Sequence, residues 1–287
     1  MSHVGFNITE NKLQLIEVVE KSKKFYLEIV DEEIFPELLN FQSSDFIDIL
    51  QTAFDNLNQR NQLKSKKVSV ALPADLFRIF SFPLEASLDE IKLSEQIEWE
   101  FSMLFPTLSF SDHIIRQKKI SKGINSYPEI LVIAIDQKPV KTLYDFLIGN
   151  NLALQFIDYA HFTSDLLIKK SNSISIYASK NAISCCSYTS NELIGFRKFE
   201  PNNNVNLIDY LNNSISQMDN NLIEFFISGD VKFDALQREI EDSLKINFNI
   251  IDPFSRIQLS ESFIQNDHFI NQKDLFSSAA GICFRIS

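Results

Sequence analysis

The order of apolar segments constrains the fold of this 287-residue chain more than any other feature of its sequence. Strand-length runs with alternating or continuous apolar residues come in clusters, and helix-length segments with a 3.6-residue period follow each cluster. This succession begins near residue 4 and begins again near residue 173. A βββαβα order that occurs twice predicts an α/β or α+β protein built from two similar halves.

The first lobe is expected to span residues 1–165 and opens with a hairpin. Val4–Ile8 is apolar, Thr9–Lys12 is polar and typical of a turn, and Leu13–Val18 alternates in polarity. A second polar segment, Glu20–Lys24, separates this hairpin from a third strand. The chain therefore starts as an antiparallel meander.

The segment that begins at Ser87 is the strongest helix candidate, and it falls within an inserted subdomain expected near residues 75–125. Ser87 and Glu90 form a capping box, and Pro106 ends the helix. Apolar residues recur on one helical face at Leu93, Ile97, Phe101 and Leu104. Trp99 lies off this face, and we expect it to pack against a neighbouring element.

The second lobe is expected to span residues 166–287. It begins with three strands in meander order and continues with helices that alternate with single strands. The chain closes with an apolar helix over residues 274–286, which we expect to pack back on the first lobe.

Glycine is scarce, and this scarcity limits the kinds of site that the chain can build. Average usage near 7% would give roughly 20 glycines, whereas the chain has 6. Phosphate cradles, nucleophile elbows and dinucleotide loops need glycine for positive φ angles or for close approach of the backbone to a ligand. The glycines lie far apart, at Gly5, Gly123, Gly149, Gly195, Gly229 and Gly281. A protein with several such loops is therefore excluded.

Charge and reactive side chains exclude further classes. The formal net charge is −11, so a nucleic-acid partner is not expected. The two basic stretches, Lys64–Lys67 and Arg116–Lys119, are interpreted as solvated loop or strand ends. No histidine has a second histidine or a cysteine at ligand spacing, so neither a metal site nor a catalytic histidine is expected.

The three cysteines, Cys185, Cys186 and Cys283, are odd in number and lack a CxxC spacing. We expect reduced, buried thiols in a cytoplasmic protein, with Cys185 and Cys186 on opposite faces of a strand. No signal peptide is recognised in residues 1–20. The longest apolar run, Ile130–Ile135, is too short to span a bilayer, so no membrane insertion is expected.

Several stretches, in the right order along the chain, resemble the actin-like protein of type IV pilus assembly. The most specific is Ile97–Pro106, IEWEFSMLFP, beside that family's I-x-W-E-x-x-x-x-I-P. Weaker matches are Val4–Val18, Val70–Leu84, Leu131–Tyr159, Asp252–Phe254 and Ser277–Arg285. The length, the phenylalanine content and the lack of glycine also resemble an uncharacterised bacterial family assigned the actin-like ATPase fold. The resemblance implies a two-lobed actin-like (duplicated ribonuclease H-like) fold of the actin/Hsp70/sugar-kinase superfamily.

The resemblance also implies where a nucleotide would bind. In the family's first phosphate loop, Asp and Gly stand where this chain has Asn7 and Thr9, and Lys stands at Gln14. The second loop, within Ile174–Ser184, has neither Asp nor Gly, and the adenosine motif keeps only Gly229. We therefore expect a degenerate nucleotide site with no cofactor, no metal and no catalytic residue. The candidate cleft residues are Asn7, Thr9, Glu10, Ser228, Gly229 and Asp230.

The resulting hypothesis is a non-catalytic actin-like protein, a pseudo-ATPase that acts as a scaffold or binding module. Its partner would be a protein held in the interlobe cleft or at the surface near Trp99, and the resemblance implies the cytoplasmic tail of a membrane protein. The alternative is a divergent ATPase or small-molecule kinase of the same superfamily that keeps nucleotide through Asn7, Thr9, Ser228 and Gly229. A self-associating structural protein is a third hypothesis. The sequence leaves the partner, the pathway and the oligomeric state open.

Overall fold

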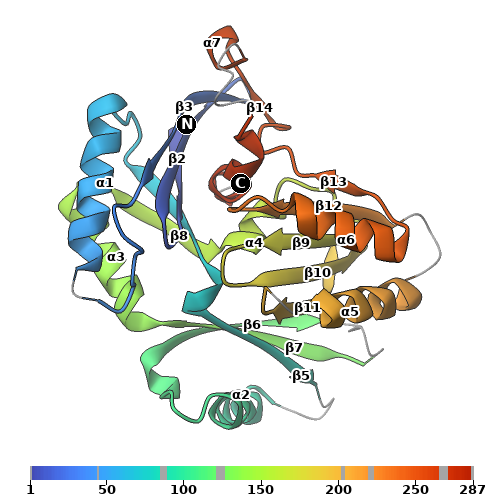
Figure 1. Ribbon diagram of the computed structural model, residues 1–287. Coiled ribbons are helices and arrows are strands. Elements are labelled where there is room, and N and C mark those ends of the chain that lie inside the picture. The colour runs from blue at the N-terminus through green and yellow to red at the C-terminus, as the bar shows by residue number, and fades with distance from the viewer. Residues whose placement is uncertain are drawn as a thin grey trace.

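The computed structural model describes residues 2–43, 45–84, 89–120, 127–201, 204–218, 223–264 and 271–285. Three β-sheets organise these residues, and Figure 1 shows two larger lobes with a smaller sheet beneath them. The doubled succession of strands and helices is confirmed, because each lobe has a mixed sheet that begins with an antiparallel meander. No helix within these ranges is both long and apolar enough to cross a membrane.

The first lobe contains a six-stranded sheet. Its strands, in order across the sheet, are β14 (Ile257–Gln258), β3 (Lys24–Ile34), β2 (Lys12–Lys21), β1 (Ser2–Ile8), β4 (Lys67–Leu72) and β8 (Ala153–Tyr159). Helices α1 (Phe46–Arg60) and α3 (Gln137–Gly149) cover one face of this sheet (Figure 1). Phe54 of α1 contacts Phe6 and Phe146 edge to face, with ring centroids 6.1 and 5.7 Å apart, and the three rings belong to one continuous apolar core.

The second lobe contains a five-stranded sheet. Its strands, in order across the sheet, are β11 (Glu192–Phe199), β10 (Ile183–Thr189), β9 (Asn172–Ala178), β12 (Glu224–Gly229) and β13 (Phe248–Ile250). Helices α5 (Asn204–Gln217) and α6 (Asp234–Leu244) pack on one face, over an apolar core that includes Cys185. Cys186 points to the opposite face, into a cluster with Tyr188. The three cysteines are buried and free, as the sequence predicts.

Two short helices, α4 (Ala160–Ser164) and α9 (Ser277–Ile282), contact each other between the two larger sheets. α9 also contacts β1 and β12, one strand from each lobe. A Cβ atom on Gly281 would lie 1.9 Å from a carbonyl oxygen at α4, and one on Gly5 would lie 2.2 Å from a carbonyl oxygen of α9. Because both distances are far below van der Waals contact, only glycine allows these backbones to approach so closely.

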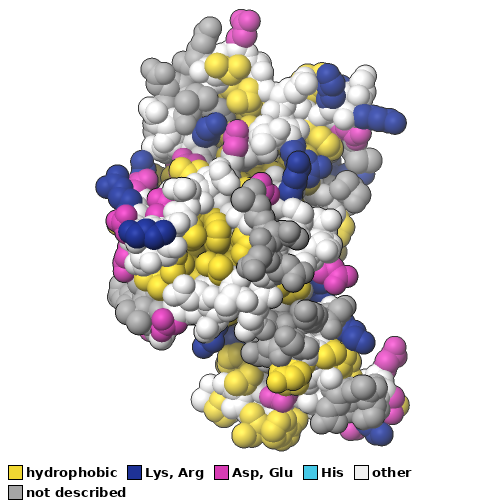
Figure 2. Space-filling view, turned by 90° about the vertical axis from the view of Figure 1, so that its right-hand side faces the viewer, with side chains coloured by type: hydrophobic (Ala, Val, Ile, Leu, Met, Phe, Trp, Pro, Cys, Tyr) yellow, Lys and Arg dark blue, Asp and Glu magenta, His cyan; other side chains and the backbone are white. Residues whose placement is uncertain are grey.

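The third sheet is small and has the order β5 (Phe77–Pro83), β7 (Glu129–Asp136) and β6 (His113–Ile120). Helix α2 (Glu90–Leu104) packs beside it through its buried residues Ile97 and Phe101. Two expectations for this helix are wrong. Trp99 is 60% exposed rather than packed against a neighbour, and Leu104 is 53% exposed rather than part of the buried face. The space-filling view shows apolar side chains gathered at its lower end, at the height of α2 (Figure 2).

The remaining elements among the described residues are short. They are three 3-10 turns, η1 (Ala74–Leu76), η2 (Phe110–Asp112) and η3 (Lys273–Phe276), and one single-turn helix, α7 (Glu261–Ile264). Asp89 caps α2, since its side chain accepts a hydrogen bond from the backbone N–H of Lys92 at 2.9 Å. Ser87, the cap predicted from the sequence, lies outside the described residues.

Two hairpin turns show how so few glycines suffice. Ser22 and Lys23 join β2 to β3, and Ser190 and Asn191 join β10 to β11, all with φ between 52° and 67°. Tight hairpin turns require such positive φ angles, which favour Gly and Asn because a Cβ atom is strained there. These four residues are not glycine, so each positive φ angle costs on the order of 1 kcal/mol of backbone strain.

We predict that Gly281→Ala destabilises the protein by about 2 kcal/mol or more, because the new methyl group collides with the backbone of α4. Urea unfolding followed by circular dichroism measures this change. The matched control is Gly149→Ala at the end of α3, where nothing lies within 4 Å of the added Cβ. That variant should be neutral or more stable by up to about 1 kcal/mol. Equal midpoints for the two variants would contradict the close packing of α9.

Candidate functional site

The β1–β2 turn, where the resemblance implies a phosphate loop, is closed by its own hydrogen bonds. The backbone N–H of Thr9 donates to the carbonyl oxygen of Lys12 at 3.0 Å. The hydroxyl of Thr9 accepts from the backbone N–H groups of Asn11 at 3.3 Å and Lys12 at 3.1 Å. A phosphate cradle works by pointing such N–H groups at the ligand. Here three of these donors are directed into the turn itself.

The strand positions on either side of this turn carry a buried amide pair. The side-chain amide of Asn7 on β1 donates to the side-chain oxygen of Gln14 on β2 at 3.0 Å, and both residues are fully buried. Gln14 in turn donates to Glu32 at 3.1 Å, and Lys12 forms an ion pair with the same carboxylate oxygen at 3.1 Å. These polar groups therefore bond across neighbouring strands of the sheet.

The second-lobe candidates lie at the end of β12. A Cβ atom on Gly229 would lie 2.2 Å from the carbonyl oxygen of Ala178 on β9, so the glycine allows two parallel strands to approach. The backbone N–H of Asp230 donates to that same oxygen at 3.1 Å. The hydroxyl groups of Ser228 and Ser164 are 2.8 Å apart and buried. Packing and internal hydrogen bonds thus account for Ser228 and Gly229.

Three carboxylates interact where the first turn meets the second lobe. Asn181, in the β9–β10 turn, donates its side-chain amide to Asp75 at 2.9 Å and also to Glu10. Burial, together with the hydrogen bond to Asp75, raises the pKa of Glu10 to about 7. Burial also raises the pKa of Asp230 to about 7, against the opposing charge of Lys12. Asp230 keeps one carboxylate oxygen without a hydrogen-bond partner among the described residues.

This cluster has two chemical consequences. Ionised carboxylates at the lobe junction repel a phosphate group that carries no metal ion, but carboxylates also serve as ligands of Mg²⁺. A carboxyl group with a pKa near 7 can also exchange a proton at neutral pH, as a general acid or base does. The raised pKa values of Glu10 and Asp230 are therefore the observation that an enzymatic role would start from.

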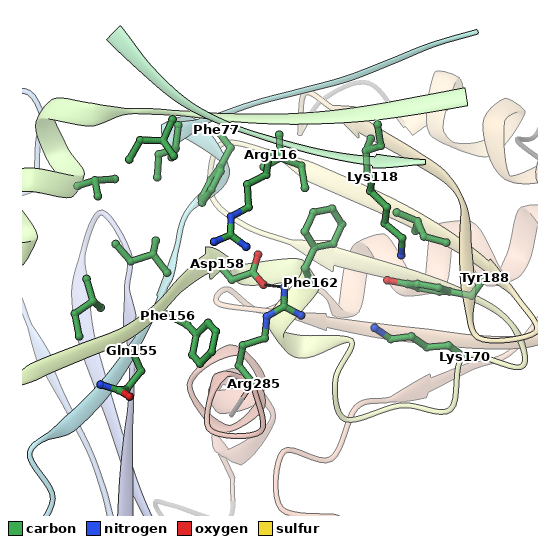
Figure 3. Close-up of a pocket in the computed structure, with 18 residues that line it drawn as sticks. Phe77, Arg116, Lys118, Gln155, Phe156, Asp158, Phe162, Lys170, Tyr188 and Arg285 are labelled. Atoms are coloured by element: carbon green, nitrogen blue, oxygen red, sulfur yellow. Dashed lines mark ion pairs between the residues drawn. The ribbon is translucent and has the colours of Figure 1, made fainter. Parts of the chain in front are cut away.

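A groove of about 710 Å³ opens elsewhere, between the first-lobe sheet and the third sheet (Figure 3). β8 and β6 both contribute to its lining, and each is the last strand of its sheet in the described part of the chain. Phe77, Phe156 and Phe162 are among its apolar residues, and Phe156 is 38% exposed. The volume is typical of ligand-binding pockets, and edge strands offer backbone groups to an added strand.

Among the described residues, four cations and one carboxylate line this groove. Arg116 and Lys118 project from β6, while Lys170 and Arg285 project from the opposite side (Figure 3). Arg285 forms an ion pair with Asp158 at 2.7 Å. Burial raises the pKa of Asp158, although the charge of Arg285 acts against this rise. The groove is thus both apolar and basic, on a chain whose formal net charge is −11.

A buried polar network lies beside the groove. His161, Asp165 and Cys186 bring one potential metal-ligating atom each within 4.8 Å of the others. Both ring nitrogens of His161 already have partners, the hydroxyls of Ser184 at 2.7 Å and Ser175 at 3.0 Å. Burial lowers the pKa of His161 and raises that of Cys186, so the thiol stays protonated. A metal would have to break these bonds, so we interpret the network as structural.

The structure places the candidates predicted from the sequence in different settings. Asn7 and Ser228 are buried within their sheets and do not line the groove. Thr9 shapes the first turn. Glu10 and Asp230 lie close enough for their charges to interact, so the fold brings these two together from opposite lobes.

The sequence interpretation missed the groove. It treated Arg116–Lys119 as a solvated strand end, and these residues are indeed exposed. Strand alternation was the available signal, because side chains two residues apart share a face. Ile114, Arg116 and Lys118 accordingly point into the same groove. What the sequence could not indicate was the opposite wall, which comes from distant segments.

No family model matches the sequence, and no curated protein matches it. Solved structures do match over almost the whole chain, and they show that the fold is that of the actin-like ATPases, as the sequence predicts. The similarity to PilM of type IV pilus biogenesis is confirmed at the level of the fold.

Three similar structures illustrate this fold. A chain of the PilM–PilN type IV pilus biogenesis complex has a TM-score of 0.74 at 15% identity, over 99% of this chain and 98% of that one. A Bacteroides thetaiotaomicron protein with an actin-like ATPase fold and unknown function has a TM-score of 0.53 at 15% identity, over 98% and 95%. The cytoplasmic domain of EpsL, an inner membrane component of the Vibrio cholerae type II secretion system, has 0.52 at 8% identity, over 91% and 87%.

We predict that Glu10→Gln stabilises the protein at pH 8 more than at pH 5. The pKa of Glu10 is about 7 in the folded state against 4.5 ordinarily, so the folded state binds the proton more tightly. The contribution of Glu10 to the free energy of unfolding therefore falls as the pH rises from about 4.5 to about 7. A glutamine carries no charge and does not show this loss.

The measurement is the Tm difference between variant and wild type across this pH range. Glu95→Gln removes an exposed carboxylate from α2 and controls for net charge. Asp230→Asn should change stability in the same direction as Glu10→Gln, because the pKa of Asp230 is raised as well. A Tm difference for Glu10→Gln that stays constant from pH 5 to pH 8 would contradict the raised pKa.

Proposed function

We propose that this chain is a non-catalytic actin-like protein that binds an extended segment of a protein partner in the groove between β6 and β8. The groove carries this proposal, because it combines apolar side chains, charge and two edge strands. Peptides commonly bind such sites by adding a strand to an open sheet edge, with alternate side chains entering pockets.

The geometry at the lobe junction supports the non-catalytic part. Nucleotide binding in this fold would need backbone donors free at the first turn, and those of Thr9, Asn11 and Lys12 are directed inward. The alternative, a divergent ATPase or kinase, would have to bind Mg-ATP against this arrangement.

The identity of the partner is proposed by analogy. One structural neighbour belongs to a PilM–PilN complex, and another is the cytoplasmic domain of an inner membrane component. We therefore propose that the partner segment is the cytoplasmic tail of a membrane protein, and that this chain acts as its cytoplasmic scaffold. The analogy rests on fold alone and contributes less than the groove.

Calorimetric titration tests the proposal that this chain does not bind nucleotide. We expect no saturable heat with Mg-ATP or Mg-ADP up to millimolar concentration, and no rise in Tm. A ligand at 100 times its Kd would stabilise the fold by about 2.7 kcal/mol, which a melting curve detects easily. Saturable binding at micromolar affinity would overturn the proposal, and Thr9→Ala would then show whether the first turn is responsible.

Site-specific photo-cross-linking tests the groove. Benzoylphenylalanine in place of Phe156 should capture a partner protein in the organism that makes this chain, because Phe156 is 38% exposed within the groove. Mass spectrometry identifies the captured protein and its cross-linked segment. A membrane protein linked through its cytoplasmic tail is the expected product.

The matched control carries the same cross-linker at Tyr144 of α3, which is 47% exposed and outside the groove lining. It should yield no shared product. Identical products from both positions would count against the groove as the binding surface, and so would the absence of any product from the cross-linker at position 156.

A further inference from the structure

The groove contains cations that have no counter-ion of their own. Among the described residues, Arg285 is paired with Asp158. No carboxylate in this part of the chain lies within ion-pair distance of Arg116, Lys118 or Lys170, although the charge of Asp158 also acts on Arg116 and Lys170. The ammonium group of Lys170 lies over the ring of Tyr188, 4.8 Å from its centroid. A cation placed over an aromatic ring is held in position but is not neutralised.

The two lysines also affect each other. Figure 3 shows Lys118 and Lys170 reaching toward Tyr188 from opposite sides of the groove. Partial burial lowers the pKa of Lys118, and the positive charges of Lys170 and Arg285 lower it further, although the charge of Glu192 on β11 acts against this fall. Like charges held this way are unfavourable in the empty groove, and an anion between them would relieve the repulsion.

Resting on the proposed function, we infer that the bound segment presents an acidic side chain, Asp or Glu, to Lys118 and Lys170. The neighbouring apolar residues of that segment contact Phe77, Phe156 and Phe162. The partner is thus a peptide that mixes carboxylates with apolar residues, and a purely apolar or basic segment binds less well.

Charge complementarity favours an acidic peptide segment as the ligand of the groove. The described part of the lining has four cations against one carboxylate, whereas the whole chain is strongly acidic. An apolar segment without carboxylates would cover Lys118 and Lys170 and leave them unpaired in a less polar setting, which is costly. An extended segment fits the spacing, because residues two apart in a strand share one face.

Selection from a displayed library of random short peptides tests this inference. The bait is the full chain, and the comparison baits are Phe156→Asp, Lys118→Gln/Lys170→Gln and Lys119→Gln. Lys119 is the matched control, because it follows Lys118 on β6 and is outside the groove lining. All four changed side chains are exposed or partly exposed, and thermal unfolding checks that each bait is folded.

We expect enriched peptides with Asp or Glu among apolar residues. Their affinity should fall about tenfold in Lys118→Gln/Lys170→Gln, since each such ion pair contributes on the order of threefold. It should stay unchanged in Lys119→Gln and weaken steeply with added salt. Two other outcomes separate the two proposals.

Peptides that need Phe156 but lack carboxylates, and bind the double lysine variant equally well, would overturn the inference and leave the proposed function standing. No enrichment at all, or enrichment that Phe156→Asp does not affect, would overturn both, because the groove would then not be a peptide site.

Discussion

The fit of α9 between the two lobes is the constraint on which the rest of the structure depends. Its residues are fully buried. The hydroxyl of Ser278 donates to the carbonyl oxygen of Ala160 at 3.0 Å, and the hydroxyl of Tyr177 lies 2.9 Å from the same serine oxygen. Gly5 and Gly281 let the neighbouring backbones close on it. Because α9 is packed so tightly, it cannot shift relative to its neighbours, and it therefore fixes the relative position of the two sheets. Arg285 lies shortly after α9, which ends at Ile282, and it lines the groove.

The succession of strands and helices could be predicted from the sequence because their periods are local patterns, and the resemblance to the actin-like family then implied the two-lobed fold. Three of the glycines allow the backbone to approach another segment of the backbone rather than a ligand. They are Gly5, Gly229 and Gly281. The groove could not be predicted, because its walls meet only after folding. Arg116, Lys170 and Arg285 come from segments far apart in the chain. The exposure of Trp99 and Leu104 on α2 likewise depends on tertiary packing, which local sequence patterns do not indicate.

The two lobes are joined at their junction by the chain's own side chains. Asn181 reaches from the second lobe to Asp75, and Lys198 donates to the carbonyl oxygen of Ala74 at 3.2 Å. Internal bonds of this kind can hold the lobes at a fixed angle without any ligand between them. A binding surface on such a scaffold is formed in advance, so less ordering free energy is lost when a partner binds.

The open edges of β6 and β8 have a consequence for the behaviour of the protein at high concentration. An unprotected strand edge can pair with a strand of another copy, and natural proteins prevent this with charged side chains, especially lysine, on the edge strand. On β6 the charged residues are Arg116, Lys118 and Lys119. Two copies meeting groove to groove would bring their cations face to face and repel each other. The charges that we infer to favour an acidic segment would thus also disfavour such pairing between two copies.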